Sequence, residues 1–197
     1  MPLATYDQIA PRYDASMSRW ERWLLGDLRS QTLKLLPPNS RILEVGAGTG
    51  LNFGFYPSGT TGIATEPNRE MLKYLIEKPR PIGVSLVQNR AEELPFASGV
   101  FDAAFATLVF CTVASPAKAF AELRRVVRSG GLVVLLEHVR PDGILGPLTD
   151  VLSLATVPLC GDHYNRRTAE TVAASRLEVL EVQKHKRGFI NLITCRV

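Results

Sequence analysis

The feature that most constrains the fold of this chain is the segment RILEVGAGTG at residues 41–50, in which three alternate glycines follow an apolar run. A short apolar run bounded by glycine predicts a buried strand. Glycine has no Cβ, so Gly46, Gly48 and Gly50 let the backbone turn sharply and approach a ligand closely. The segment therefore predicts a strand that ends at a binding crevice, with the carboxylate of Glu44 just ahead of the glycines.

Apolar runs and helical patterns alternate along the next hundred residues. Further strands are predicted at 61–66, 84–89, 101–110 and 132–139. Helices are predicted between them at 68–78 and 115–131. Ser115 and Pro116 fit the start of the second helix, and the glycine pair 130–131 fits its end. Because strands and helices alternate, the sheet should be parallel with right-handed crossovers.

The pattern changes after residue 140. The apolar segment 144–160 predicts a helix that is either buried or lies at an interface, since prolines and Asp150 interrupt it and about 20 apolar residues are needed to span a bilayer. A further helix is predicted at 165–175. Two strands, at 177–188 and 189–197, follow around a turn at Gly188 and must therefore be antiparallel to each other.

These elements predict one α/β domain with a Rossmann-like, doubly wound, seven-stranded sheet. The sheet should be mostly parallel, with an antiparallel strand near its C-terminal edge. Residues 20–36, ahead of the first strand, predict a helix. We expect four parts: a helical cap or lid (1–36), a cofactor-binding core (37–140), an acceptor-side helical segment (141–175) and a C-terminal strand pair (176–197).

Charge and cysteine content exclude several classes of protein. The chain has 23 Lys and Arg against 19 Asp and Glu, and these basic residues are scattered, so we expect no nucleic-acid partner. Three widely spaced cysteines do not form a zinc-ligand pattern or a disulfide framework, and we expect no metal. The first residues show no signal-peptide pattern. A reducing, cytoplasmic setting is the resulting expectation.

The two acids beside the glycines indicate which ligand the crevice takes. A dinucleotide fingerprint needs a third glycine where this chain has Leu51. A carboxylate at Glu44 would repel phosphates but attract a cation, by about 4 kcal/mol at 4 Å in an effective dielectric of 20. S-adenosylmethionine carries an ammonium and a sulfonium and no phosphate. Glu66, 20 positions after Gly46, can accept hydrogen bonds from the hydroxyls of its ribose.

Four blocks of sequence, in order, resemble the class I S-adenosylmethionine-dependent methyltransferases: ILEVGAGTG, TEPNREML, AEELPFASGVFDAAFATLVF and LRRVVRSGGLVVLLEH. The resemblance implies an enzyme that binds S-adenosylmethionine and releases S-adenosylhomocysteine. It places Ala91 and Glu92 near the adenine and Thr107 near the methionine end. The residues that it implies for the cofactor are Glu44, Gly46, Ala47, Gly48, Gly50, Asn52, Glu66, Pro67, Ala91, Glu92 and Thr107, with Tyr6 and Tyr13 from the N-terminal YDQIAPRYD.

A finer resemblance concerns the methyl acceptor. The blocks LEVGAGTGLNFGFYP, ATLVFCTV, LLEHV and CGDHYNRRTAE resemble the methyltransferase-like branch that methylates alkyl thiols. Animal members of that branch begin with a hydrophobic membrane anchor, a pattern not present in the first residues here. The resemblance implies a small, fairly apolar acceptor, a thiol first. Phospholipid-headgroup and quinone methyltransferases share many of these blocks, so both acceptors remain alternatives.

Two histidines are candidates for a general base, because histidine titrates near neutral pH. His138 ends the predicted strand 132–139, where a purely structural role is the alternative. His163 lies in a polar cluster with Asp162 and Tyr164, which is typical of a pocket wall. The segment 144–160 could roof an apolar acceptor pocket or make a peripheral contact with a membrane. Two further classes remain, a non-catalytic cofactor-binding module and a nicotinamide-dependent oxidoreductase; Glu44 and Leu51 disfavour the oxidoreductase.

Overall fold

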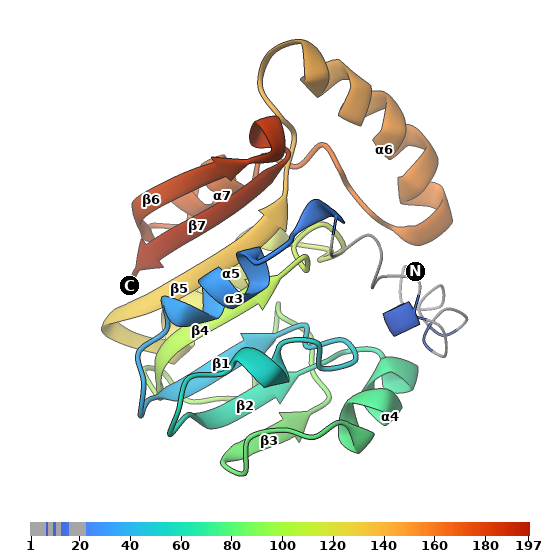
Figure 1. Ribbon diagram of the computed structural model, residues 1–197. Helices are drawn as coiled ribbons and strands as arrows, with labels where there is room; N and C mark the ends of the chain where they lie inside the picture. Colours follow the sequence, from blue (N-terminus) through green and yellow to red (C-terminus); the bar gives the residue numbers. More distant parts are fainter. Residues whose placement is uncertain (1–6, 8–9, 11–12, 16–22) are drawn as a thin grey trace.

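The computed structural model describes residues 7, 10, 13–15 and 23–197. Its centre is a seven-stranded sheet in the order β3-β2-β1-β4-β5-β7-β6 (Figure 1). The strands are β1 Arg41–Val45, β2 Thr61–Thr65, β3 Val84–Val87, β4 Phe101–Thr107, β5 Val127–His138, β6 Glu178–His185 and β7 Ile190–Arg196. Strands β1 to β5 pair in parallel, and β7 runs antiparallel to both β5 and β6. The predicted sheet, with an antiparallel strand near its C-terminal edge, is confirmed.

Helices cover both faces of this sheet. They are α3 Leu28–Lys34, α4 Arg69–Glu77, α5 Pro116–Val126, α6 Gly146–Cys160 and α7 Thr168–Ala174, with 3-10 turns η2 Phe53–Phe55, η3 Gly143–Leu145 and η4 Lys186–Gly188. On one face, Phe120 of α5 and Val172 of α7 pack in the same buried cluster as Leu43 of β1. On the other face, Leu33 of α3 packs in a cluster with Ile42. Neighbouring residues of β1 thus face opposite layers, as a strand buried on both sides requires.

The strand order reverses between β1 and β4, the innermost strands of the two halves. In an open α/β sheet, the loops that leave such a pair at its carboxyl end diverge to opposite faces and leave a crevice. The glycine segment follows β1, and the loop 108–113 follows β4. The topology therefore places these two segments on either side of one crevice.

The helix predicted at 115–131 ends earlier than its pattern indicates. Ser115 and Pro116 do begin α5, but the helix ends at Val126 and β5 begins at the next residue. The glycine pair joins the sheet edge instead, because Gly130 N donates to Val197 O at 2.8 Å and Val197 N donates to Gly131 O at 3.0 Å. Tertiary hydrogen bonds to the C-terminus thus replace the helical bonds that this stretch would otherwise form.

The helix predicted at 20–36 is also shorter within the described residues. Gly26 adopts a left-handed φ of +51°, and α3 begins only at Leu28. A left-handed residue ends a helical run, so the helical residues Trp23 and Leu24 are followed by a turn at 25–27 ahead of α3. The remainder of the predicted helix, residues 20–22, lies outside the described residues, as do residues 1–6, 8–9, 11–12 and 16–19 of the predicted cap.

The apolar segment predicted at 144–160 forms α6, but the buried alternative is wrong. Leu148, Val151 and Leu154 are exposed, whereas Thr149 and Ser153 on the opposite face are buried. Figure 1 shows α6 as an outlying helix at one end of the molecule. Among the described residues, no helix combines the length and the apolar character needed to cross a membrane.

Candidate active site

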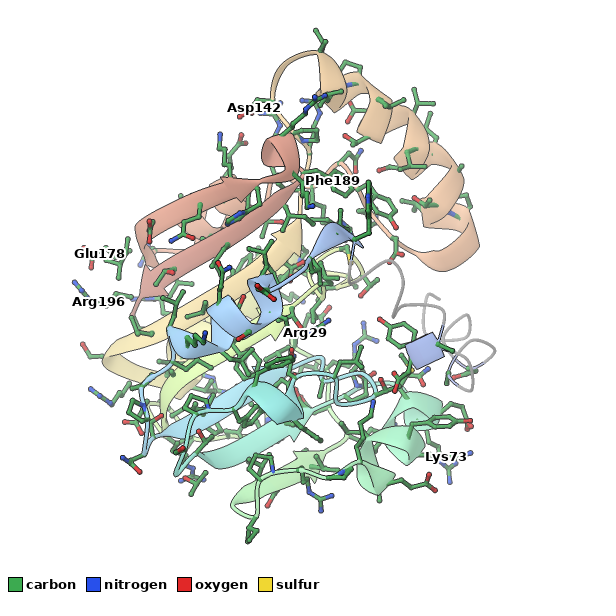
Figure 2. All side chains as sticks on the ribbon, viewed as in Figure 1. Arg29, Lys73, Asp142, Glu178, Phe189 and Arg196 are labelled. Atoms are coloured by element: carbon green, nitrogen blue, oxygen red, sulfur yellow. The ribbon has the colours of Figure 1, made fainter. Side chains whose placement is uncertain are left out.

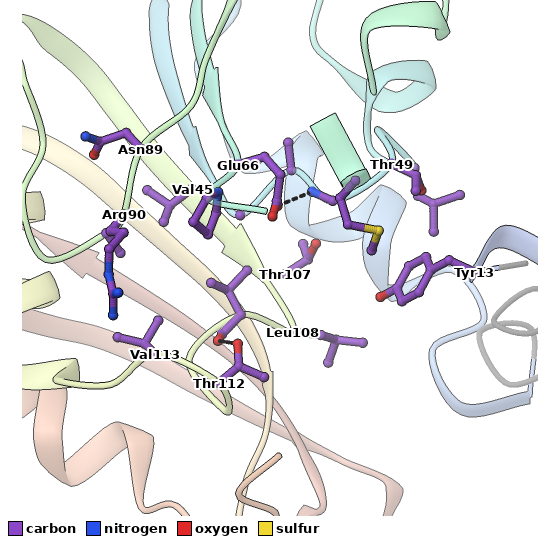
Figure 3. Close-up of a pocket in the computed structure, with 18 of the residues that line it drawn as sticks. Tyr13, Val45, Thr49, Glu66, Asn89, Arg90, Thr107, Leu108, Thr112 and Val113 are labelled. Atoms are coloured by element: carbon purple, nitrogen blue, oxygen red, sulfur yellow. Dashed lines mark hydrogen bonds between the residues drawn. The ribbon is translucent and has the colours of Figure 1, made fainter. Parts of the chain in front are cut away.

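A pocket opens at the carboxyl ends of β1, β2, β3 and β4 (Figure 3). Nine of the residues predicted to bind cofactor line it: Gly46, Ala47, Gly48, Glu66, Pro67, Ala91, Glu92, Thr107 and Tyr13. Glu44, Gly50 and Asn52 do not line the pocket, and neither do the candidate bases His138 and His163. Tyr6 lies outside the described residues. The crevice thus gathers most of the predicted cofactor set, and the binding role of each residue stays a prediction.

Two glycines shape the wall after β1 for different reasons. Gly46 has a φ of +68°, and a Cβ there would lie 2.5 Å from Val109 Cγ2, so this position packs against the loop after β4. Gly48 has a φ of +59°, and the nearest atom to a Cβ there would be Met71 Cε, 4.0 Å away. Gly46 therefore permits close packing within the protein, whereas Gly48 keeps space open on the pocket wall.

Glu66 brings a carboxylate to this wall in a fixed orientation. It follows β2, is buried, and accepts hydrogen bonds from Gly48 N at 2.9 Å and from Asn68 N at 2.8 Å. Figure 3 shows the Glu66 side chain reaching toward the glycine segment across the pocket wall. Burial raises the pKa of Glu66 above its usual value, and the two backbone N–H donors act in the opposite direction. The second predicted acid is thus held beside Gly48 before any ligand arrives.

Glu44, by contrast, lies behind the pocket wall. It is fully buried, and its carboxylate accepts hydrogen bonds from Asn52 Nδ2 and from Tyr56 OH, both at 2.5 Å. Burial raises the pKa of Glu44, while the bonds from Asn52 and Tyr56 and the nearby Arg29 lower it. The predicted proximity of this acid to a cationic ligand is therefore indirect: Asn52 also donates to Thr107 Oγ1 at 3.0 Å, and Thr107 lines the pocket.

Arg29 is a site residue that the sequence analysis missed. It lies on α3, is 8% exposed and lines the pocket. Its Nη1 donates to Asn52 Oδ1 at 2.5 Å and to Thr107 Oγ1 at 2.8 Å. A single Arg in a helix carries no sequence signal, and only the packing of α3 over the sheet brings it to the crevice. Arg29 supplies a positive charge where Thr107 was expected to meet the methionine end.

The wall beyond β3 combines polar and charged groups. Asn89 and Arg90 line the pocket next to the predicted pair Ala91 and Glu92 (Figure 3). The Oδ1 of Asn89 is buried and has no hydrogen-bond partner among the described residues. Glu92 accepts from Ala114 N at 3.0 Å and from Ser115 N at 3.2 Å, so it anchors the start of α5 to this wall. Ala91 and Glu92 thus line the pocket, their place beside an adenine stays a prediction, and Asn89 adds a buried acceptor to the same wall.

The N-terminal segment reaches the glycine loop. Tyr13 lines the pocket on the side opposite Asn89 and Arg90 (Figure 3). Its neighbour Asp14 accepts a hydrogen bond from Thr49 Oγ1 at 2.5 Å and pairs with Lys78, the residue that follows α4. Tyr13 therefore lines the same pocket as the glycine segment, and its contact with a cofactor stays a prediction.

The loop after β4 forms the apolar wall, and a buried acid holds it. Leu108, Val109 and Val113 line the pocket, and Leu108 adopts a left-handed φ of +57°. Glu137 of β5 accepts from Val109 N at 3.0 Å and from Phe110 N at 3.1 Å. Burial raises the pKa of Glu137 to about 7, against the lowering effect of these two bonds. The strained turn at Leu108 is thus fixed from beneath by a carboxylate that the sequence analysis did not single out.

The segment after α6 joins the same loop but does not enter the pocket. His163 N donates to Cys111 O at 3.2 Å, and Arg166 donates to Phe110 O. Burial lowers the pKa of His163, and nearby Arg166 lowers it further. His138 is buried and stacks on Tyr164 with ring centroids 4.4 Å apart. Burial lowers the pKa of His138 to about 4, so it is neutral at pH 7.

Comparison with known proteins identifies the class. Residues 43–135 match the family described as a methyltransferase domain. The phosphatidylethanolamine N-methyltransferase of Cereibacter sphaeroides is 30% identical over 183 residues, which are 85% of this chain and 90% of that relative. The chain therefore belongs to the methyltransferase family.

Two further proteins show how far the likeness extends. The thiol S-methyltransferase TMT1B of Mus musculus is 34% identical over 77% of this chain, and the match spans less than two thirds of that relative, 64%. A SAM-dependent methyltransferase from Thermotoga maritima has the same fold, with a TM-score of 0.77 at 19% identity over 100% of this chain and 99% of that structure. The predicted fold and family are both confirmed.

Proposed function

We propose that the protein transfers a methyl group from S-adenosylmethionine to a small, fairly apolar acceptor, a thiol first. The observation that carries the proposal is the placement of Glu66: a buried carboxylate held beside Gly48, on the wall of a pocket whose other side is apolar. A carboxylate there suits a ribose and a cationic ligand, and the apolar side suits an acceptor that leaves water.

The residues present fit this cofactor. The backbone at Gly48 leaves space on the pocket wall, and Glu66 retains free lone pairs for ribose hydroxyls. The unpartnered Oδ1 of Asn89 suits the amino group of an adenine. Arg29 suits the carboxylate of the methionine part and Tyr13 can cover it. When bound, S-adenosylmethionine supplies the activated methyl group, and S-adenosylhomocysteine is the expected product.

The protein itself supplies alignment and exclusion of water. Methyl transfer is an in-line displacement, so most of the acceleration comes from holding the acceptor in the correct direction. Leu108, Val109 and Val113 provide an apolar wall for an alkyl group. A thiol reacts as its thiolate, and a nearby neutral histidine can take the proton. His163 is our candidate because it is half-buried, its pKa is lowered, and its segment contacts the loop 108–113.

His138 is a weaker candidate for the base. Its ring is stacked on Tyr164 and buried, and it does not line the pocket. A structural role explains these contacts without any contact to an acceptor. Replacing His163 by Ala should therefore lower turnover at least about tenfold with cofactor affinity unchanged. The control is Lys184→Ala, which changes an exposed residue that does not line the pocket.

A phospholipid headgroup is the second acceptor class. The specific observation in its favour is that the Cereibacter sphaeroides relative, named a phosphatidylethanolamine N-methyltransferase, matches along 90% of its own length. A quinone ring is a third class, supported by the sequence resemblance and by a Renibacterium salmoninarum relative named a demethylmenaquinone methyltransferase, 33% identical over 75% of this chain. We propose a cytoplasmic setting for all three, because an odd number of widely spaced cysteines is typical of a reducing compartment.

The test is production of S-adenosylhomocysteine from S-adenosylmethionine with three acceptors: a small alkyl thiol, phosphatidylethanolamine vesicles and a demethylated quinone. The Glu66→Ala variant is the negative control, and binding of S-adenosylhomocysteine is measured separately by calorimetry. Thiol-dependent product supports the first proposal, and product with one of the other acceptors replaces the thiol. Binding without product on any acceptor would instead favour a non-catalytic cofactor-binding module.

A further inference from the structure

Helix α6 exposes apolar side chains and buries polar ones, which is the opposite of what is expected for a helix that faces water. The side chains of Leu148 and Val151 are each 65% exposed, and Leu154 is 78% exposed. Thr149 and Ser153, on the face toward the protein, are 6% and 3% exposed. A water-facing helix normally buries its apolar stripe and exposes its polar one. The outward apolar face of α6 therefore lacks the partner that its composition requires among the described residues.

The outer face of α6 also lacks charge. Asp150 is the one charged residue in the helix sequence. Its carboxylate is paired with the guanidinium of Arg140, with Nε and Nη2 at 3.0 Å and 2.9 Å. The pair neutralises the helix, so an apolar environment around α6 would not have to accept an isolated charge.

A basic turn adjoins the start of α6. We define it as residues 184–188, which include the exposed Lys184, Lys186 and Arg187. A Cβ added at Gly188 would lie 3.9 Å from Pro141 Cα, and Lys184 pairs with Asp142 at 2.7 Å. In Figure 2, Asp142 lies at the end of the molecule from which α6 begins. The turn thus brings cations to the segment that leads into the apolar helix.

An exposed tryptophan accompanies these cations. Trp23 is 67% exposed, and the Nζ of Lys186 lies 5.8 Å from its ring centre. Ile144, in η3 just before α6, is 93% exposed. Tryptophan and basic residues beside an apolar helix are the combination found where proteins meet the headgroup region of a bilayer. Charge and apolar surface together point to an anionic lipid surface, whereas a protein partner would not require both.

We propose that α6 and the basic turn dock the protein on an anionic lipid bilayer. The face formed by Leu148, Val151 and Leu154 enters the headgroup boundary, while Lys186 and Arg187 meet anionic lipid. This orientation buries the exposed apolar side chains and needs no membrane-spanning segment. The inference concerns attachment alone, so it does not depend on the proposed methyl transfer.

The test is sedimentation of the full chain with vesicles of phosphatidylglycerol and phosphatidylcholine, and with vesicles of phosphatidylcholine alone. We expect the protein to bind the anionic vesicles at least about tenfold more strongly, and high salt to weaken the binding. The triple variant Leu148→Gln, Val151→Gln, Leu154→Gln should lose at least about tenfold in the partition coefficient. Lys186→Gln with Arg187→Gln should weaken binding to anionic vesicles more than to neutral ones.

The matched control is Ile76→Gln with Ile82→Gln, which changes apolar residues that are 56% and 107% exposed elsewhere on the surface. It should bind vesicles like the unchanged chain. Circular dichroism and calorimetric binding of S-adenosylhomocysteine show that each variant is folded. Amide hydrogen exchange with vesicles present should show protection confined to residues 144–158 and to the basic turn.

Three outcomes would overturn the proposal. The first is equal sedimentation with anionic vesicles and without vesicles. The second is undiminished vesicle binding by a folded triple variant. The third is a concentration-dependent dimer in sedimentation velocity that the triple variant abolishes, without vesicle binding by the unchanged chain. That last result would assign the face to a second copy of the chain.

Discussion

Each side of the pocket contains a buried carboxylate that accepts hydrogen bonds from two backbone N–H groups, but only one of the two carboxylates lines the pocket. On the side of β1 and β2, the Glu66 carboxylate accepts from two backbone N–H groups and lines the pocket. On the side of β4 and β5, the Glu137 carboxylate also accepts from two backbone N–H groups, those of Val109 and Phe110, but it does not line the pocket. One acid is available to a ligand, and the other is occupied entirely by a loop.

The difference also concerns distance along the chain. Glu66 is 18 residues from Gly48, and both belong to one strand-turn-strand unit. Glu137 is 27 residues from Phe110, and Arg166, which donates to Phe110 O, is 56 residues away. The side of β1 and β2 is assembled locally, whereas the side of β4 and β5 depends on three separate segments. We therefore expect substitutions on the first side to change ligand affinity, and those on the second to change loop stability.

The largest expected effect comes from filling the cofactor side. Gly48→Val should lower the affinity for S-adenosylhomocysteine by at least about 100-fold, because valine disfavours the left-handed backbone and its side chain occupies the open wall. Isothermal calorimetry measures this. Gly54→Val, in the same segment but with an ordinary φ and no atom near its Cβ, is the control and should bind normally. Near-normal affinity of the Gly48 variant would place the ligand elsewhere.

Removing Glu66, an acid that lines the pocket, should lower the affinity less. Glu66→Ala loses charge-assisted hydrogen bonds worth about 1.5–3 kcal/mol, which is a loss of about 10- to 150-fold in affinity. The change also frees Gly48 N, so Glu66→Gln, which keeps an acceptor oxygen, should retain part of the affinity. Glu70→Ala on α4, which removes the exposed partner of Lys73, is the control. An unchanged dissociation constant for Glu66→Ala would mean that the other acid binds the ligand.

On the side of β4 and β5, we expect two buried titratable groups, Glu137 and His138, to make the free energy of unfolding depend on pH. The pKa of Glu137 is raised from 4.5 to about 7, so the native state binds this proton more tightly than the unfolded state. The contribution of Glu137 to the free energy of unfolding is complete below pH 4.5 and falls, by at most about 3 kcal/mol, as pH rises to 7. The pKa of His138 is lowered from 6.5 to about 4, so stability falls by a similar amount as pH drops from 6.5 to 4. Between about pH 4.5 and 6.5 the two slopes oppose each other.

Single variants should separate these slopes. Glu137→Gln should leave a protein that loses stability steeply on acidification, and His138→Phe, which keeps the stacking on Tyr164, should leave one that loses stability toward pH 7. Urea unfolding at several pH values measures both. Parallel pH profiles for the two variants would show that neither group is titrating as its burial requires.

The smallest effect on the ligand should come from the acid behind the wall. Tyr56→Phe removes one of the donors to Glu44 and leaves a buried carboxylate oxygen unsatisfied, which costs about 1–3 kcal/mol of stability. The affinity for S-adenosylhomocysteine should change less than about twofold, since Glu44 does not line the pocket. Tyr74→Phe on α4 is the control for stability. A large loss of affinity with normal stability would show that Glu44 acts on the ligand directly.

The sequence predicted the pocket wall after β1, β2 and β3 far better than the wall after β4. Gly46, Gly48, Glu66 and the pair Ala91 and Glu92 all line the pocket, because each follows a strand whose periodicity is visible and whose end meets the crevice. Arg29 and Glu137 were missed. Their roles depend on which element packs against which, and a lone Arg or Glu in a regular element gives no local signal.

What the sequence by itself determined is the alternation of strands and helices, the left-handed glycine turn and the acid at the end of β2. These follow from short-range rules of burial, backbone sterics and spacing. Only the tertiary structure decided that Glu44 lies behind the wall with Tyr56 and that Glu137 holds the loop after β4. It also decided that Leu148, Leu152 and Leu154 of α6 lie exposed on the surface. Apolar periodicity identifies a helix face, but the direction of that face depends on the neighbouring elements.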